Sequence, residues 1–521
     1  MEDSAASPGA DRACALRRRW LRAAAGGALA GWLPAALAAP RARAEAAEPI
    51  RSAASRPLAV DWSGLPAALR PVINAAGLPA TSFGVQVQDV SGRGRPLASL
   101  NAEHPYQLAS TAKVVTALAA LDLLGAHYRW RTYAFVTGPV ANGRLLGDLL
   151  IVGGGDSRLR SAGLLAWFQR LQREGLREIW GNVVLDRFAF RLHEDDHTNT
   201  PPPAADRPHH ARPDALTLDE GVLQVSVQAA ARGKPLVQLT PPLAGLKLMN
   251  ELSPGAGCAL WAQAASAPGG GPGLALRGRW SAGCGVRDLS LAPLPHDEFT
   301  VRAVEGLWLQ AGGTLKGRVI DKRLPDRESL LPLGPDGHPV MPYSVHLSDP
   351  LPAVIREINK RSDNLGARNL MLSLVRGFPL RAATMGEARK RVEDWLRAQG
   401  LAPGDIALEN GSGLSRGERG KPRAMVQLLQ RAWASNQAQA FIDSLPIAGV
   451  DGTLAHRMTS GKATGAAFLK TGTLLDTRAL AGYVRATSGR TYAVAALVNH
   501  PEAQRATPSL DALIEWIARN G

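Results

Sequence analysis

The stretch Tyr106-Gln-Leu-Ala-Ser-Thr-Ala-Lys-Val-Val-Thr-Ala-Leu-Ala-Ala-Leu121 decides how this chain is interpreted. Its leucines and valines recur at helical spacing, which predicts a mostly buried helix that ends near Gly125. Ser110 and Lys113 are three positions apart, so a helix places them on one face. An amine buried beside a hydroxyl loses part of its preference for the charged form and can take the serine proton. The alternative is a serine N-cap with a solvated lysine, because a chance Ser-x-x-Lys match is expected about once in a chain of this length.

Two later motifs favour the catalytic interpretation. Ser362-Asp363-Asn364 begins 252 positions after Ser110, and Lys470-Thr471-Gly472-Thr473 follows nearer the carboxyl end. The ordered set of Ser-x-x-Lys, Ser-Asp-Asn and Lys-Thr-Gly is the signature of β-lactamases and penicillin-binding proteins. Each element is common alone, whereas the three in this order point to a serine acyl-enzyme.

The chain resembles the D-alanyl-D-alanine carboxypeptidase/endopeptidases of the penicillin-binding protein 4 type, from about residue 60 to the end. The gap of 252 residues between the first two motifs discriminates best, because class A β-lactamases have a far shorter separation and this family inserts two accessory domains there. Other segments are similar to family segments and stand in family order: Gly153-Gly-Gly-Asp156, Gly181-Asn-Val-Val-Leu-Asp186, Gly411-Ser-Gly-Leu-Ser-Arg416, Gly452-Thr-Leu454 with Arg457, and Leu480-Ala-Gly-Tyr-Val484.

The resemblance implies an α/β fold, with a transpeptidase/β-lactamase-like catalytic domain that is interrupted by two inserted, mainly β accessory domains. The catalytic domain would comprise residues 58–135 and 338–521. The first inserted domain would comprise residues 136–212 and 293–337, and the second residues 213–292.

Periodicity predicts the individual elements. Alternation of apolar and polar residues, or short apolar runs, predicts strands at 83–90, 131–136, 145–152, 178–185, 480–484 and 492–498. Apolar spacing predicts helices at 164–174, 299–310, 392–399 and 510–518, and another that leads into Ser362. Residues 221–250 and 270–290 are rich in strand-forming and turn-forming residues.

Catalytic roles follow partly from chemistry and partly from the resemblance. Ser110 would attack the carbonyl between two D-alanines and form an acyl-enzyme, with Lys113 as its base. Ser362 would relay a proton to the leaving amine, with Lys470 beside it, and Asn364 would hold the substrate amide. The charge of Lys470 would also disfavour a second cation and so help to keep Lys113 neutral.

Substrate-binding roles fall on the third motif. Thr471 and Thr473, together with the lysine before them, supply the hydroxyls and the cation that suit a terminal carboxylate. Gly472 would let the strand approach the bound peptide without a side chain in the way. The backbone amides of Ser110 and Thr473 are the expected oxyanion hole.

Arg416 matches the arginine that, in this family, faces the side chain of the third residue of the stem peptide. The alternative is a salt bridge within a loop. The family's tryptophan-containing loop, which helps to recognise diaminopimelate, has no match in residues 193–200, where Asp195 or Asp196 would substitute. Selectivity for the third residue of the substrate therefore stays open.

The charge balance is strongly basic, with 60 Lys and Arg residues against 45 Asp and Glu residues and a formal net charge of +15. Such an excess predicts an anionic partner. Aromatic residues make up only 5% of the chain, and neither zinc-finger spacing nor a basic-aromatic RNA motif is present, so nucleic acid is not predicted. The charge suits the carboxylates of peptidoglycan peptides and equally a peripheral contact with a membrane surface. β-Lactam antibiotics are the predicted inhibitors.

Residues 1–46 resemble an export signal. A basic region, Arg17-Arg18-Arg19-Trp20-Leu21-Arg22, precedes a weakly apolar run at 23–39 and the small residues Ala42-Arg43-Ala44, which offer a cleavage site. The arginines are similar to a twin-arginine signal, although no Ser or Thr precedes them, so the export route stays open. Glycines and a proline in the apolar run argue against a permanent membrane span. We predict a periplasmic protein with a cleaved signal peptide.

Cys258 and Cys284 lie 26 positions apart in a glycine-rich region. An oxidising periplasm would permit a disulfide between them. Two free buried thiols are an equally open alternative.

Neither a metal nor a cofactor is predicted. Gly153-Gly-Gly155 is not followed by the Lys-Ser/Thr of a phosphate-binding loop, so we interpret it as a structural turn. The loop predicted at 193–213 carries histidines that show no metal-ligand spacing: His193, His197, His209 and His210.

Two other functions compete with a peptidoglycan peptidase. A β-lactamase would share the acylation step but would deacylate penicillin quickly, and the long insertion and the lack of a dedicated deacylating glutamate argue against it. A non-catalytic peptidoglycan-binding scaffold would keep the fold without turnover, and the intact motifs argue against that. Carboxypeptidase and endopeptidase activities use the same residues, so the sequence does not rank them.

Overall fold

The structure is a computed structural model that describes residues 60–193, 196, 212–230, 234–322, 338 and 340–521. The predicted export signal, Asp195 and three of the four loop histidines lie outside these ranges. Within the described part of the chain, every helix is too short or too polar to cross a membrane.

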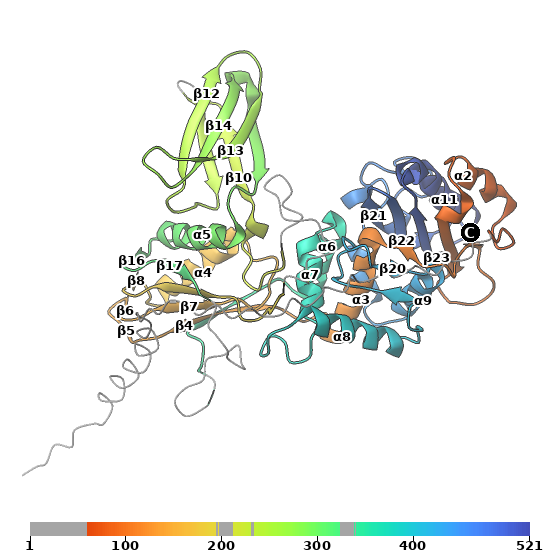
Figure 1. The fold of residues 1–521 in the computed structure, drawn as a ribbon, viewed down its shortest axis with the longest axis horizontal. Helices are drawn as coiled ribbons and strands as arrows, with labels where there is room; N and C mark the ends of the chain where they lie inside the picture. The colour runs from red at the N-terminus through yellow and green to blue at the C-terminus, as the bar shows by residue number, and fades with distance from the viewer. Residues whose placement is uncertain (1–59, 194–195, 197–211, 231–233, 323–337, 339) are drawn as a thin grey trace, which may run out of the picture. The chain divides into compact units, whose positions relative to one another are not determined.

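Both ends of the chain build one antiparallel sheet of five strands, in the order β2-β1-β23-β22-β21. Its strands are β1 (Phe83–Asp89), β2 (Ala98–Leu100), β21 (Ala467–Leu474), β22 (Thr477–Arg485) and β23 (Thr491–Asn499). Val85 of β1 pairs with Ala496 of β23, so the amino-terminal hairpin joins the carboxyl-terminal strands. Figure 1 shows the red and orange amino-terminal segments beside the blue carboxyl-terminal ones.

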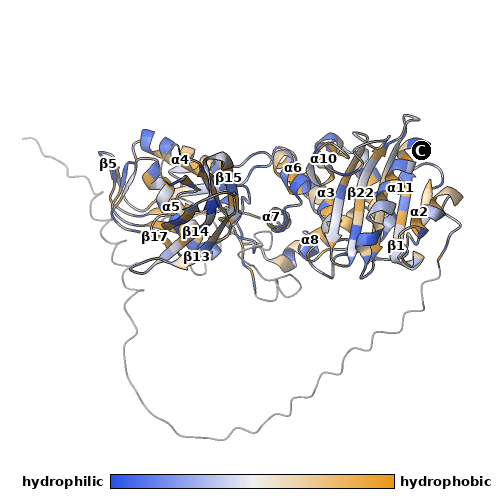
Figure 2. Cartoon of the chain, turned by 90° about the horizontal axis from the view of Figure 1, so that it is seen from above, coloured by the Kyte–Doolittle hydropathy of each residue, from blue (hydrophilic) through white to orange (hydrophobic). Residues whose placement is uncertain are grey.

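Helices cover both faces of this sheet because its strands are apolar on both sides. The adjacent residues Leu480 and Ala481 of β22 belong to two different hydrophobic cores. The covering helices are α2 (Arg70–Asn74) and α11 (Thr507–Asn520) on one face, and α3 (Ala112–Leu124) and α9 (Pro422–Trp433) on the other. A strand buried on both faces is mostly apolar along its length, although β1 buries Gln86 and β21 buries Lys470. Figure 2 shows both hydrophobic and hydrophilic segments along the strands of this sheet.

The predicted helix around Ser110 is confirmed. It begins as the 3₁₀ turn η4 (Ala109–Thr111), continues as α3, and ends where Gly125 adopts a φ of 81°. Every residue from Ala112 to Leu121 is buried.

Further helices pack near α3. They are α6 (Leu351–Arg361), α7 (Asn364–Leu372), α8 (Met385–Ala398) and α10 (Ala438–Ser444). A small sheet lies beside them, with β3 (Tyr106–Gln107), β19 (Ile406–Ala407) and β20 (Arg419–Gly420). The helix expected at 392–399 is the second half of α8, which starts earlier because Thr384 and Glu387 form a capping box.

We call residues 131–347 the middle region. Two of its sheets have the orders β17-β9-β7-β4-β18 and β16-β8-β6-β5. The strands of the first are β4 (Arg131–Val136), β7 (Leu149–Val152), β9 (Val183–Asp186), β17 (Val319–Asp321) and β18 (Ser344–Leu347). Those of the second are β5 (Val140–Ala141), β6 (Arg144–Leu145), β8 (Glu178–Ile179) and β16 (Thr314–Leu315). Helices α4 (Ser161–Arg173) and α5 (His296–Gln310) contribute to the hydrophobic core that they share and confirm the helices predicted there.

The continuous strands expected at 145–152 and 178–185 are wrong. Each breaks at a glycine and divides between the two sheets, because the chain crosses from one sheet to the other at that point. The amide of Gly181 donates to the carbonyl of Gly147 at 3.0 Å, and a Cβ on Gly181 would lie 2.2 Å from Asp148 Oδ1. Gly147-Asp148 and Gly181-Asn182 interrupt the apolar runs at these points, and the strand prediction overlooks this turn signal.

The β-rich character expected at 221–250 and 270–290 is confirmed, and the structure adds β13 (Leu260–Ser266) between these ranges. The strands form two three-stranded sheets: β10 (Leu223–Gln228), β11 (Leu236–Thr240) and β15 (Val286–Leu291), and β12 (Lys247–Pro254), β13 and β14 (Pro272–Trp280). A disulfide joins Cys258 to Cys284, which decides between the two alternatives left open by the sequence.

Candidate active site

The first two motifs meet at Lys113. Its Nζ lies 3.0 Å from Ser110 Oγ and 2.6 Å from Asn364 Oδ1, and it also contacts the carbonyl oxygen of Ser412. The 3₁₀ turn and the helix that follow one another in this stretch therefore bring the serine and the lysine together as their spacing predicted. The amine is completely buried.

The environment of Lys113 favours its neutral form. Burial lowers the pKa of this amine to about 7, against the opposing influence of the carboxyls of Asp363 and Glu418 and with a smaller contribution from the charge of Arg368. A base works best when its pKa is close to the working pH. Lys113 is therefore suited to take the proton of Ser110 near neutrality.

The Ser-Asp-Asn motif is placed by the junction of two helices. Ser362 ends α6 in the left-handed conformation, with a φ of 58°. Asp363 caps α7, accepting the amide of Gly366 at 3.0 Å, and Asn364 is the first residue of that helix. The junction turns Ser362 and Asn364 toward the two lysines of the other motifs.

Lys470 lies on β21, the outer strand of the sheet, and is completely buried. Its Nζ lies 3.0 Å from Ser362 Oγ and 2.9 Å from the carbonyl oxygen of Thr471. Burial lowers its pKa well below the usual range, and the charge of Lys113 lowers it further. The second lysine is thus near enough to the first for the two charges to oppose each other.

The rest of the third motif lies along the same strand. The hydroxyls of Thr471 and Thr453 are 2.7 Å apart, and Thr473 is exposed. A Cβ on Gly472 would lie 2.9 Å from the carbonyl oxygen of Leu108 and 3.1 Å from Ala109 Cβ. This glycine is therefore needed for the close packing of β21 against the turn that carries Ser110, a reason different from the peptide approach that the sequence suggested.

Arg416 forms an ion pair with Asp476 and donates to Gln107 Oε1 at 3.1 Å. The salt bridge that the sequence left as an alternative is therefore present. About half of the side chain, 53%, stays exposed. Contact with the third residue of a substrate remains a prediction.

Sequence reasoning missed the buried charges behind the site. Glu418 accepts backbone amides of the loop that contains Ser412, and Arg368 lies buried on α7. From the sequence, a lone acidic residue in a glycine-rich loop is expected to be solvated, and an arginine on a helix is expected to lie at the surface. Only the packing of the loop against α3 and α7 shows otherwise.

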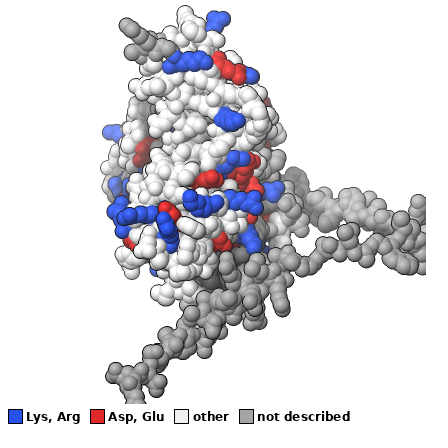
Figure 3. Space-filling view, turned by 90° about the vertical axis from the view of Figure 1, so that its left-hand side faces the viewer, with Lys and Arg blue, Asp and Glu red and all other residues white. Residues whose placement is uncertain are grey.

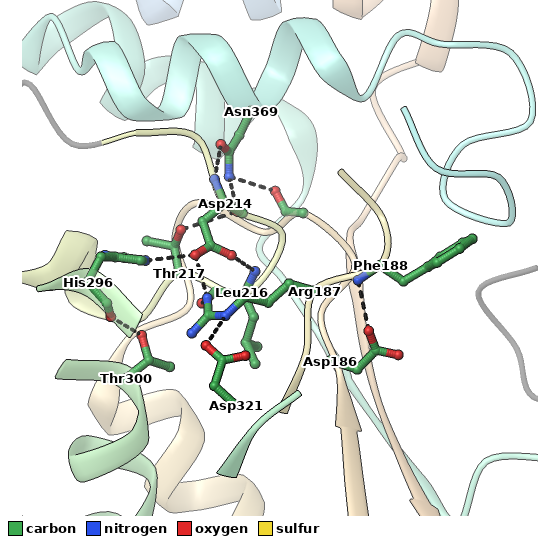
Figure 4. Close-up of polar contacts among 11 residues, drawn as sticks. Asp186, Arg187, Phe188, Asp214, Leu216, Thr217, His296, Thr300, Asp321 and Asn369 are labelled. Atoms are coloured by element: carbon green, nitrogen blue, oxygen red, sulfur yellow. Dashed lines mark hydrogen bonds and ion pairs between the residues drawn. The ribbon is translucent and has the colours of Figure 1, made fainter. Parts of the chain in front are cut away.

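A second polar cluster joins the middle region to α7, as Figure 4 shows. Asn369 donates to the carbonyl oxygen of Asp214 at 2.9 Å and to that of Gly155 at 3.3 Å. Arg187 pairs with Asp214 and with Asp321, and is 5% exposed. Removal of one partner of such a buried pair leaves an uncompensated charge, so this cluster fixes how Gly155 and Asp214 meet the helix that begins with Asn364.

Close approaches of neighbouring backbone explain why glycines stand at 153 and 154. Cβ atoms on Gly153 and Gly154 would lie 2.4 Å from the carbonyl oxygen of Ala215 and 2.0 Å from that of Arg131. These close backbone approaches support the structural interpretation of the run. Among the described residues, no group of three or more His, Cys, Asp or Glu residues could hold a metal ion.

Comparison with known proteins identifies relatives over most of the chain. The model of the D-Ala-D-Ala carboxypeptidase 3 (S13) family matches residues 65–520. D-alanyl-D-alanine carboxypeptidase DacB of Haemophilus influenzae is 27% identical over 412 residues, which cover 75% of this chain and 80% of that protein. A D-alanyl-D-alanine carboxypeptidase of an Actinomadura species is 29% identical over 442 residues, 80% of this chain and 78% of the relative.

The crystal structure of penicillin-binding protein 4 from Haemophilus influenzae is similar in fold. It aligns with a TM-score of 0.66 at 22% identity, over 86% of this chain and 99% of that one. A complex of that protein with a β-lactam aligns with a TM-score of 0.59 at 23% identity. The likeness shows a shared mixed α/β fold.

Proposed function

Because the chain belongs to the D-Ala-D-Ala carboxypeptidase 3 (S13) family and is a serine-type D-Ala-D-Ala carboxypeptidase, we propose that it cleaves peptidoglycan stem peptides through an acyl-enzyme on Ser110. The observation that carries this proposal is the position of Lys113 Nζ, within hydrogen-bond distance of both Ser110 Oγ and Asn364 Oδ1. A buried amine held against a hydroxyl is the arrangement that activates a serine nucleophile.

Acylation begins when Ser110 Oγ attacks the carbonyl carbon between two D-alanines. Its proton passes to neutral Lys113. The backbone amides of Ser110 and Thr473 donate hydrogen bonds to the carbonyl oxygen and stabilise the negative charge that develops on it. The carbon–nitrogen bond then breaks. Ser362, with Lys470 Nζ at 3.0 Å, relays to the leaving amine the proton that Lys113 took from Ser110, so Lys113 becomes neutral again. Water later hydrolyses the ester and releases the shortened peptide.

Substrate binding uses the outer strand and the loop beside it. Nζ of Lys470 and the hydroxyls of Thr471 and Thr473 would bind the terminal carboxylate, and Gly472 would keep β21 packed close to the nucleophile. Asn364 would hold the substrate amide. Arg416 would face the third residue of the stem peptide if it exchanged its ion pair with Asp476 for a substrate carboxylate.

Two inserted accessory domains are part of the proposal. The strands of the five-stranded sheet come from residues 83–100 and 467–499, whereas the sheets of the middle region are built within residues 131–347. This arrangement supports a catalytic domain interrupted by 136–212 with 293–337 and by 213–292. Those limits stay predictions.

Benzylpenicillin should form a stable covalent adduct with the purified protein, visible as an increase in intact mass equal to that of the antibiotic. The Ser110→Ala variant should form none, because the adduct requires the hydroxyl. Rapid hydrolysis of penicillin without a lasting adduct would favour a β-lactamase. Neither adduct nor hydrolysis would leave a peptidoglycan-binding scaffold and contradict the mechanism.

We also propose that the protein is periplasmic, exported with residues 1–46 as a cleaved signal. The support is the basic, apolar and small-residue order of that segment. Cells that produce the full chain should hold the shortened protein in the periplasmic fraction, and a chain without residues 1–46 should stay in the cytoplasm. Recovery of the intact full chain from the cytoplasm alone would contradict export.

A peripheral contact with an anionic membrane surface is proposed for the exposed face of β16-β8-β6-β5. Leu146 and Trp180 are 53% and 49% exposed, and they follow the paired strands β6 and β8. Three exposed cations accompany them: Arg144, Lys316 and Arg318. Figure 3 faces the side on which these strands lie and shows a band of Lys and Arg there, with Asp and Glu side chains among them. In the same fractionation, part of the protein should sediment with membranes and be released by salt. Absence from the membrane fraction at low salt would contradict this contact.

A further inference from the structure

The buried carboxylate of Glu418 organises the loop behind the nucleophile. Its Oε1 accepts the backbone amides of Glu409, Asn410 and Gly411 at 3.1, 3.0 and 2.6 Å, and its Oε2 accepts that of Gly413. The side chain is completely buried. Burial raises the pKa of the carboxyl, and the four amide bonds oppose that rise. Four donors spread over both oxygens fit the ionised form, which only accepts hydrogen bonds.

The loop held in this way contacts both the base and the nucleophile. The carbonyl oxygen of Ser412 accepts from Lys113 Nζ, and that of Gly411 accepts from Thr116 Oγ1 at 2.8 Å on the next turn of α3. A Cβ on Gly413 would lie 1.9 Å from the carbonyl oxygen of Ala109 and 2.7 Å from the backbone nitrogen of Ser110. A shift of this loop would therefore move the Ser412 carbonyl oxygen, which accepts from Lys113 Nζ. It would also displace the backbone of Ser110, against which Gly413 packs.

The same carboxylate balances buried cations. Arg368 is 2% exposed, and its Nε and Nη2 have no hydrogen-bond partner within the described residues. Burial lowers the pKa of Arg368 to about 10, and the charge of Glu418 is the largest influence in the opposite direction. Glu418 also favours the charged form of Lys113. The other charged groups near Lys113 are Asp363 and Lys470.

We propose that Glu418 is a positioning residue for acylation: it holds the loop that presents the Ser412 carbonyl to Lys113, and its charge balances Lys113 and Arg368. The inference rests on the proposed function, because it assumes that Lys113 is the base. Within the described residues, the side chain of Glu418 accepts backbone amides of the loop and forms no hydrogen bond with Ser110 or Lys113. Its effect is transmitted through the loop and through its charge.

The pH dependence of acylation by benzylpenicillin distinguishes this role from simple structural support. The acylation rate rises as Lys113 loses its proton, so the midpoint of the acid limb reports the pKa of the base. Glu418→Gln keeps the shape and removes the charge. Without that charge Lys113 loses its proton at lower pH, and we expect the midpoint to move down by about 0.5–1 pH unit. The maximal rate should fall about 10–100-fold, because the amide nitrogen of the glutamine would face the amide of Gly413.

Two further variants make the test specific. Arg368→Met removes a neighbouring cation, so the midpoint should move in the opposite direction, to higher pH. Glu418→Asp keeps the charge on a shorter side chain, so it should restore the wild-type midpoint while the rate stays reduced. Glu387→Gln, which removes a hydrogen-bonded carboxylate that caps α8, is the control and should leave the midpoint unchanged.

An unshifted midpoint in Glu418→Gln would overturn the proposal, whatever happens to the rate. If that variant does not fold, the Arg368→Met midpoint decides alone: a shift to higher pH supports the charge balance, and no shift or a lower midpoint overturns it. The wild-type protein separates this result from the function. If the wild type forms no adduct on Ser110, the function fails; if it forms one and the midpoints do not move, only the role of Glu418 fails.

Discussion

Replacement of Lys113 by methionine is expected to slow acylation by benzylpenicillin about 10²–10⁴-fold at neutral pH, the range typical for loss of a positioned general base. Methionine keeps an unbranched apolar stem in the completely buried position and removes only the amine. In the wild type, the rate should rise as the pH increases through about 7, where Lys113 becomes neutral. The variant should lose this rise. The measurement is the second-order rate constant of adduct formation between pH 5 and 9.

Stability provides an independent check on the same residue. The pKa of Lys113 is about 7 in the folded protein and near the ordinary value of 10.5 in the unfolded chain, so the unfolded chain binds more protons between these values. Wild-type stability should therefore fall as the pH decreases from about 10 to 7, and Lys113→Met should weaken this trend. Lys390→Met, at a side chain that is 72% exposed, is the control. An unchanged rate in Lys113→Met would exclude Lys113 as the base.

The second large effect is expected from Gly413→Ala. The new methyl group would lie 1.9 Å from the carbonyl oxygen of Ala109, so either the loop or the turn that carries Ser110 must move. A displacement of about 1 Å near the reacting group can cost about 100-fold in rate. We expect a loss of that size in the acylation rate, measured with the same antibiotic.

Gly404→Ala is the matched control for this substitution. Gly404 has a φ of 84°, close to the 86° of Gly413, but a Cβ there would meet nothing within 4 Å. Both variants should lose about 1–2 kcal/mol of folding free energy through the left-handed backbone. Only Gly413→Ala should lose acylation. Equal rates in the two variants would show that the close approach to Ala109 does not matter for catalysis.

The part of the site that could be predicted from the sequence is the part set by short spacing. Ser110 and Lys113 meet because three positions along a helix bring two side chains to one face. The convergence of Asn364 and Lys470 on them came from the ordered motifs, since the chain between these residues gives no local reason for it. Membership of the family accounts for the order of the three motifs, whereas hydrophobic periodicity does not.

What sequence reasoning could not supply depends on contacts between distant segments. Glu418 and Arg368 read as surface charges until the loop and α7 enclose them. The Gly-Asp and Gly-Asn pairs at 147–148 and 181–182 do mark the two strand breaks, but the transfer of the chain from one sheet to the other at these points depends on strand pairing that the sequence does not show. The bond between Cys258 and Cys284 depended on loops whose approach no spacing rule determines.

The pairing of β1 with β23 has a consequence for the order in which the protein can assemble. During synthesis, residues 83–89 emerge long before residues 491–499, with which they pair. The strands of the middle region find all their strand partners within residues 131–347, so these sheets can pair before the last strands of the chain are made. The amino-terminal hairpin can pair with β23 only after residues 491–499 have been made, and contacts between such distant segments form slowly. Ser110 on η4 therefore gains its neighbour β21 only when the chain is almost complete. A nascent or truncated form that lacks those last strands also lacks Lys470 beside Ser362.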